Sequence, residues 1–170
     1  PHHTMDVWQH TLHVLDNIEP EEPMRLAALL HDIAKPEVFY FDKNLIGHFA
    51  GHAVAGAAMA ETILKRLRYD AATVREVTEL VRGHMLLLPA SERAARRLLA
   101  QAGPEKTRRL LRLHRADRMG KGTEEKAALE AQVRAAEALV EAVLQKESCF
   151  SLRQLALSGG DLIAQGIPQG

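Results

Sequence analysis

Cysteine, net charge and long apolar runs are all scarce in this 170-residue chain. Cys149 is its one cysteine, so it has no intramolecular disulfide, and a lone thiol fits a reducing compartment. Basic and acidic residues number 22 each, so the overall charge points to no class of partner. No apolar run approaches the roughly 18 residues that span a bilayer, and no signal peptide is visible. We therefore expect a cytoplasmic protein with no membrane partner.

Aromatic residues are also few, at 4% of the chain, whereas hydrophobic residues as a whole reach 46% and alanine is plentiful. A β-sandwich draws on β-branched and aromatic residues, while closely packed helices do not need them. The length suits one domain with at most a small appendage. The composition therefore predicts an all-α fold, a helical bundle.

Helix start and stop signals divide the chain in the way this fold class requires. Pro23 suits a first helical position and Ser91 suits an N-cap. Residues 36–49 have no helical period and are expected to form a loop or a short hairpin. The Gly-rich tail, 148–170, is expected to be only weakly helical around 161–165. The expected helices cover residues 5–18, 23–35, 50–68, 71–87, 92–102, 105–119 and 123–146.

Helical phase separates histidines that point inward from those that face water. His10 shares an apolar stripe with Val7 and Val14, three and four residues away, whereas His13 is in phase with polar residues. We therefore expect His10 to be buried and His13 to be exposed. Other side chains on apolar stripes are His31, His52, His84 and Asp117, and Asp32 is an acid at the end of an otherwise apolar helix.

Several inward-pointing histidines and carboxylates in one small bundle favour a metal site. A single inward histidine is more often a packed core residue than a ligand. A buried carboxylate is harder to explain, because an unpaired buried charge costs several kcal/mol, so Asp32 and Asp117 need an arginine or a metal nearby. Mixed nitrogen and oxygen ligands suit a divalent ion such as Mn, Fe, Co, Ni, Zn or Mg, and without a thiolate cluster a structural zinc site is not expected.

The order of these residues resembles the H…HD…D pattern of the HD superfamily of metal-dependent phosphohydrolases. His10 lies in DVWQHTLHVLD, the His31-Asp32 pair in AALLHDIAKP, and Asp117 in LLRLHRADRMGKG. The segments GHFAGHAVAGA, with His52, and ELVRGHM, with His84, resemble the two further histidines of members that hold two metal ions. The resemblance implies an HD-type helical domain over residues 1–147, with one or two divalent ions.

A narrower resemblance connects the chain, including its tail LALSGGDLIAQGIPQG, with bacterial CCA-adding tRNA nucleotidyltransferases and poly(A)-polymerase-like proteins. The similarity is to the C-terminal half of those proteins. Their nucleotidyltransferase head needs a D-x-D pair to hold its metals, and no D-x-D occurs in these 170 residues. We expect a fragment or a stand-alone relative that does not itself add nucleotides, with 148–170 a truncated C-terminal segment.

The resemblance implies hydrolysis of a phosphate ester by metal-activated water, on nucleotides or on RNA ends such as 2′,3′-cyclic phosphates. The expected catalytic residues are Asp32, which would bridge two metals, and Lys35. Lys35 and Arg118 are expected to bind the substrate phosphate, although Lys35 equally suits a helix C-terminal cap. The metal ligands implied are His10, His31, Asp32, His52, His84 and Asp117.

Alternatives remain open at this level. The segment from Arg93 to Lys121 contains ten basic residues but only two acidic ones, Glu105 and Asp117. This stretch is either a phosphate footprint or a solvated helix surface. A non-catalytic tRNA-binding HD module and a metal-dependent nucleotide sensor are therefore rival interpretations. The oligomeric state is open, because the apolar stripe of 123–146 suits internal packing or a dimer seam. Trp8 and Cys149 are expected to serve packing rather than chemistry, and His114 either to pack or to support a metal ligand.

Overall fold

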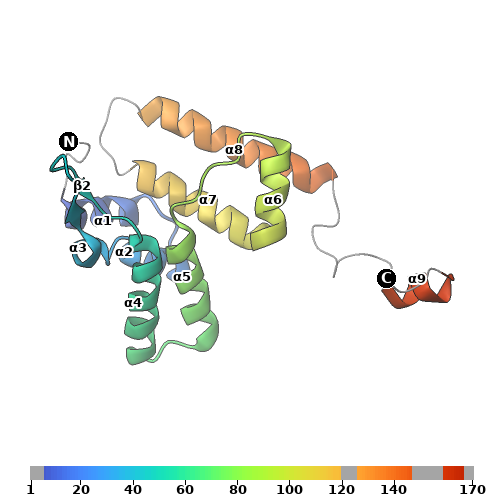
Figure 1. The fold of residues 1–170 in the computed structure, drawn as a ribbon, viewed down its shortest axis with the longest axis horizontal. Coiled ribbons are helices and arrows are strands. Elements are labelled where there is room, and N and C mark those ends of the chain that lie inside the picture. Colours follow the sequence, from blue (N-terminus) through green and yellow to red (C-terminus); the bar gives the residue numbers. More distant parts are fainter. Residues whose placement is uncertain (1–5, 120–125, 147–158, 167–170) are drawn as a thin grey trace.

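The computed structural model describes residues 6–119, 126–146 and 159–166, and it confirms the all-α fold class (Figure 1). Cys149 lies outside the described residues. None of the described helices is long and apolar enough to cross a membrane. The elements are α1 (Val7–Asp16), α2 (Glu22–Leu30), α3 (Lys35–Val38), β1 (Tyr40–Phe41), β2 (Gly47–His48), α4 (His52–Arg66), α5 (Ala71–Gly83), α6 (Glu92–Ala102), α7 (Pro104–Met119), α8 (Lys126–Lys146) and α9 (Gly159–Ala164).

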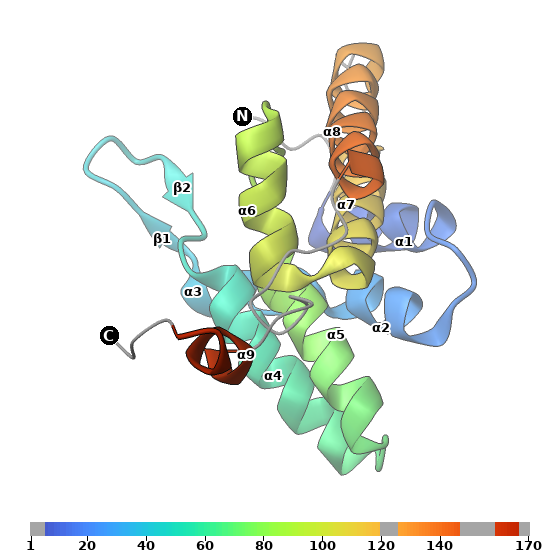
Figure 2. The ribbon, with the colours of Figure 1, turned by 90° about the vertical axis from the view of Figure 1, so that its right-hand side faces the viewer.

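Helix α7 lies at the centre and packs against α1, α2 and α5 on one side and against α6 and α8 on the other. Figures 1 and 2 show the antiparallel pair α4–α5 on one side of α7 and α8 running along the other. Consecutive residues of α7 serve the two sides. Leu110 belongs to the apolar cluster of α1, α2, α4 and α5, and Leu111 to the cluster of α6 and α8. The core is therefore double, and α7 is common to both halves.

The helices around the first cluster approach closely because small residues line their contacts. Ala57 and Ala60 of α4 are fully buried against α5. At Gly83, the last residue of α5, a Cβ atom would lie only 2.8 Å from a Leu110 methyl carbon. A larger residue there would push the end of α5 away from α7. This contact fixes the position of the next residue, His84.

Two helices end at least four residues earlier than the sequence predicts. The second helix was expected to reach Lys35, but α2 ends at Leu30, residues 31–34 form turns, and α3 begins at Lys35. Pro36 favours a new helix start, because proline suits the first turn of a helix and has no N–H to continue a previous one. The fourth helix was expected to reach residue 87 but ends at Gly83. Both early ends place a histidine, His31 or His84, at the C-cap.

Two predictions about packing had opposite outcomes. The apolar stripe of α8 packs inside the protein, since Val133, Ala136, Val140 and Val143 are at most 1% exposed and α8 contacts α6 and α7. Trp8, by contrast, was expected to be packed, and this was wrong because it is 62% exposed. Its neighbour two residues on, His10, takes the inward position of α1.

Candidate metal centre

The six predicted ligand residues converge at one place, where α1, α2, α4, α5 and α7 meet. His10 comes from α1 and Asp117 from α7, while the His31-Asp32 pair follows α2 directly. His52 is the first residue of α4, and His84 is the C-cap of α5. All six residues are buried, with at most 8% of their surface exposed. As predicted, His13 is exposed, so helical phase separated the two histidines of α1 correctly.

The six side chains form two groups that share Asp32. In the first, His31 Nε2 is 3.3 Å and His10 Nε2 is 3.7 Å from Asp32 Oδ2. In the second, His52 Nε2 is 3.5 Å and His84 Nε2 is 3.8 Å from the other oxygen, Oδ1. Each group of three donor atoms lies within 4.8 Å of one another, close enough for one cation to touch all three.

Asp117 extends the first group. Its Oδ1 lies 2.9 Å from His10 Nε2 and 3.8 Å from His31 Nε2. The first group thus offers two imidazoles and two carboxylates, whereas the second offers two imidazoles and the shared carboxylate. This mixture of nitrogen and oxygen donors suits a borderline or hard divalent ion.

Backbone carbonyls set the orientation of three of the histidine rings. The Nδ1 atoms of His31, His52 and His84 each lie 2.7–2.8 Å from the carbonyl oxygen of the residue three positions earlier. An imidazole that donates its Nδ1 proton keeps the Nε2 lone pair free for a metal. At the C-caps His31 and His84, these carbonyls belong to the last turn of the helix, where they have no intrahelical partner. The helix ends therefore aim the rings at Asp32.

The charges of the centre fit a cation site. Burial would raise the pKa of Asp32, but hydrogen bonds with His31 and Lys35 and their charges outweigh it and hold this pKa well below the ordinary value. Burial is also the main reason why the pKa of His84 falls to about 4, so this ring is neutral at pH 7, as a metal ligand must be. The centre thus combines an ionised carboxylate with a neutral imidazole.

Lys35 is the cation that faces this carboxylate in the described structure. Its Nζ lies 2.5 Å from Asp32 Oδ2 and 5.6 Å from the centroid of the Phe49 ring, and the residue is only 9% exposed. The ammonium group points back to the centre. Phosphate binding by Lys35 remains a prediction from the sequence.

A cavity of about 540 Å³ opens from the centre to the surface, and Asp32, Lys35, His52, His84 and Asp117 all contribute to its wall. Arg118 does not line it. Its Nε instead lies 3.3 Å from Nε2 of the buried His114. The geometry gives no support to phosphate binding by Arg118, which remains a prediction from the sequence.

His48 also lines the cavity, together with Phe49. The sequence predicts only a loop or short hairpin for the segment 36–49 and does not indicate this position. The signal that could have indicated it is the cluster of aromatic residues in a segment without helical period, 36–49.

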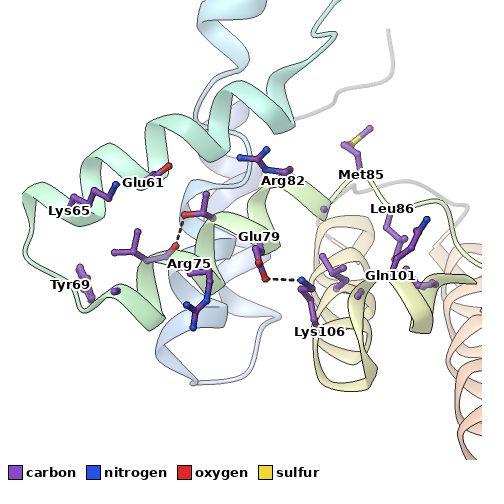
Figure 3. A pocket seen from close by; sticks show the side chains of 17 residues that line it. Glu61, Lys65, Tyr69, Arg75, Glu79, Arg82, Met85, Leu86, Gln101 and Lys106 are labelled. Atoms are coloured by element: carbon purple, nitrogen blue, oxygen red, sulfur yellow. Dashed lines mark hydrogen bonds and ion pairs between the residues drawn. The ribbon is translucent and has the colours of Figure 1, made fainter. Parts of the chain in front are cut away.

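A larger groove of about 1020 Å³ runs along α5, between the ends of α4 and α6 and the start of α7 (Figure 3). Its wall includes Arg75, Arg82 and Lys106 but none of the six candidate ligands. Met85 is common to this groove and to the metal cavity. Size alone would select the larger groove, but the titratable cluster lies in the smaller cavity.

Comparison with known families agrees with this site. The HD domain family matches residues 2–139, and the chain belongs to that family. It is 35% identical over 164 residues to the CC-adding tRNA nucleotidyltransferase of Thermus thermophilus, covering 92% of this chain and 37% of that protein. It is 36% identical over 103 residues to the A-adding tRNA nucleotidyltransferase of Deinococcus radiodurans, covering 57% of this chain and 24% of that protein. No solved structure gave a significant match.

Proposed function

We propose that this chain is a metal-dependent phosphohydrolase that cleaves phosphate esters of nucleotides or RNA ends, such as 2′,3′-cyclic phosphates. The observation that carries the proposal is the pair of buried donor groups sharing Asp32, open to a cavity bordered by Lys35. Buried ionisable groups of this kind are more common at functional sites than in purely structural cores. Membership of the HD domain family supports the proposal, and so does the position of the donor groups where five helices meet.

In the proposed site, His10, His31, Asp32 and Asp117 hold one divalent ion, and Asp32, His52 and His84 hold a second. A bound divalent ion supplies the charge that polarises phosphoryl oxygens and lowers the pKa of water. Mn, Fe, Co, Ni, Zn and Mg are all compatible with these donors. Lys35 binds a substrate phosphate from the cavity side, and its ammonium group is already held there by Asp32.

The second candidate function is a non-catalytic tRNA-binding module, which the names of the two relatives favour. In the part of the chain that the structure describes, five of the ten basic residues in the stretch 93–121, its sequence support, contact acids of other segments. Arg108 Nε is 2.7 Å from Glu141 and Lys106 Nζ is 2.8 Å from Glu79, while Arg109 pairs with Glu76. Arg112 and Arg115 also lie within 4.0 Å of acids on other segments. These ion pairs favour a structural role for the stretch.

The test combines metal analysis with turnover of bis-p-nitrophenyl phosphate and 2′,3′-cyclic AMP by the full chain. We expect co-purified or reconstituted metal, and we expect His10→Ala and Asp32→Asn to lose at least about 100-fold in turnover, since removal of a transition-state charge contact costs that much. His13→Ala is the matched control, because this histidine is on the same helix but exposed. It should behave as the wild type.

Absence of bound metal in the wild-type protein would contradict the proposed hydrolase activity. Turnover that is retained in the Asp32→Asn variant would contradict it as well. Salt-sensitive tRNA binding that persists in Asp32→Ala, with no turnover, would instead support the binding module. Turnover lost together with thermal stability in His10→Ala, but not in Asp32→Asn, would indicate a folding defect in the former.

Three further assignments belong to the same proposal. Residues 1–147 form the HD-type unit, with 148–170 as a separate tail. Nucleotides or RNA ends are the partners. The cytoplasm is the location, which the lone thiol of Cys149 suits.

A further inference from the structure

Aromatic side chains are gathered in one short segment beside the metal cavity. The chain has four Phe, two Tyr and one Trp, and four of these seven, Phe39, Tyr40, Phe41 and Phe49, lie within residues 39–49. Phe39, Tyr40 and Phe41 are 43%, 50% and 62% exposed. The segment contains the hairpin of β1 and β2, which Figure 2 shows projecting beyond α3 and α4. A protein so poor in aromatic residues thus exposes three of them next to its candidate site.

Two rings on one face of the hairpin form a stacked pair. Tyr40 and His48 are direct partners in the β1–β2 ladder, and their ring centroids are 5.5 Å apart with an interplanar angle of 28°. His48 lines the metal cavity, and its side chain is 43% exposed. Tyr40 therefore covers one face of the imidazole, and the side chain is still partly exposed.

Asp42 fixes this imidazole in place. Its Oδ2 lies 3.1 Å from His48 Nε2, and its Oδ1 accepts hydrogen bonds from the backbone N–H groups of Asn44 and Ile46 at 2.8 and 2.9 Å. One carboxylate thus holds both the hairpin loop and the ring. A planar side chain held on its edge and on one face is organised in advance for stacking.

The aromatic residues on the opposite face of the hairpin form a cluster of their own. Phe39 packs on Phe41 and Phe49, with centroids 4.9 and 5.2 Å apart. Its ring also covers Gly47, where a Cβ would lie 2.6 Å from the ring. Such contacts stabilise a hairpin whose strands have only two residues each. Side chains alternate along a strand, so Tyr40 and His48 lie on the other face and are not needed for this cluster.

We propose that His48, supported by Tyr40 and positioned by Asp42, stacks on the nucleobase of a nucleotide whose phosphate lies at the metal centre. The phosphate end of this inference rests on the proposed function, whereas the base end rests on the hairpin alone. The cavity wall and the stacked pair share His48, and the next residue, Phe49, also lines the cavity. Stacking on a ring accepts any base, so the hairpin selects nucleotides over other phosphate esters without selecting a sequence.

The test is a comparison of two ligands by isothermal titration calorimetry with the manganese-loaded full chain. Adenosine 5′-monophosphate carries a base, and ribose 5-phosphate has the same sugar and phosphate without it. We expect the wild type to bind the nucleotide about 10- to 100-fold more tightly, the range that base stacking supplies. In His48→Ala this ratio should fall towards one. In His48→Phe it should be retained, because the ring remains although its nitrogens are lost.

His13→Ala, which removes an exposed histidine from α1, should leave the ratio unchanged, and thermal unfolding of each variant checks that it is folded. Equal affinity of the wild type for both ligands, no measurable nucleotide binding, or an unchanged ratio in His48→Ala would overturn the inference. Loss of the ratio in a folded His48→Phe would also overturn it, because a polar role would then replace stacking. Because the experiment measures binding, it separates the two proposals. If the chain prefers the nucleotide but hydrolyses no ester, the hydrolase proposal is wrong and stacking on His48 is retained.

Discussion

Among single residues, Lys35 carries a charge whose partner is the buried Asp32. Its ammonium group contacts the Asp32 carboxylate, and the two side chains are only 11% and 3% exposed. Removing one partner of a buried ion pair is costly because the other charge is left without compensation. The same carboxylate is the proposed ligand of two cations, so metal and lysine share the task of neutralising it.

We therefore predict that Lys35→Met lowers the free energy of unfolding of the metal-free protein by about 3 kcal/mol. Chemical denaturation measures this loss. Addition of Mn²⁺ should recover a large part of it, because the cation takes over the compensation of Asp32. An equal loss with and without Mn²⁺ would show that Lys35 stabilises the fold through its aliphatic packing rather than through its charge.

For single residues, the sequence predicts whether a helical side chain points inward or outward, but it says less about which residues that side chain contacts. The apolar stripe of α1 was enough to separate His10 from His13, since phase decides which side of a helix a residue occupies. The same argument could not indicate His48, because its position depends on the pairing of β2 with β1 rather than on a helical period.

Among the elements, α7 and α8 are joined across their surfaces by an ion pair between Arg108 and Glu141. Hydrogen bonding to Arg108 is the main cause that lowers the pKa of Glu141, and the side chains are 34% and 46% exposed. Solvent screening limits such a pair to well under 1 kcal/mol. The larger part of the α7–α8 contact is the apolar stripe of α8.

The pH dependence of this pair follows from the lowered pKa of Glu141. Its contribution is fully present above the ordinary pKa of a glutamate and is lost as the pH falls through the lower folded-state pKa. We predict that Glu141→Gln destabilises the protein by about 0.5 kcal/mol at pH 7 and by almost nothing at pH 3. Urea unfolding at the two pH values measures the difference. An equal effect at both would mean that shape rather than charge decides the contact.

Helix boundaries show where local sequence stops being sufficient. The start of α6 was predictable because its cap is local, with the Ser91 hydroxyl oxygen accepting the N–H of Ala94. The ends of α2 and α5 were not, because residues 31–35 and 84–87 continue a helix-like pattern. Their helices end where His31 and His84 bond to carbonyls of the last turn and reach towards Asp32. That geometry is set by other helices, which a single segment cannot indicate.

For the whole molecule, the metal centre is also a structural junction. Five helices contribute to it, and all five, α1, α2, α4, α5 and α7, also share the first apolar cluster. The unfolded chain has no preformed site, so a cation that binds the folded state stabilises it by mass action.

We predict that saturating Mn²⁺ raises the midpoint of thermal unfolding, and that a chelator reverses this. At a concentration of 100 times Kd the gain is about 2.7 kcal/mol, which corresponds to a few degrees in a protein of this size. Differential scanning fluorimetry measures the shift, and Asp32→Asn should abolish most of it. A shift of the same size in that variant would place the bound cation elsewhere on the protein.

The fold class and the gathering of six ligands were predictable because they depend on composition, helical phase and motif order. The division of the core into two halves was not. It depends on Leu110 and Leu111 of α7 facing different neighbours, and apolar residues in adjacent positions do not reveal how many partners a helix has.

The shared position of Asp32 has a thermodynamic consequence. One oxygen faces each donor group, so the occupancy of one group changes the electrostatic free energy of the other. Two such sites are coupled, and the coupling is reciprocal. If both groups bind a cation, the second cation meets a carboxylate whose charge the first has already partly neutralised. The two loading steps would then be unequal in affinity, and the cation concentration would set how many ions the centre holds.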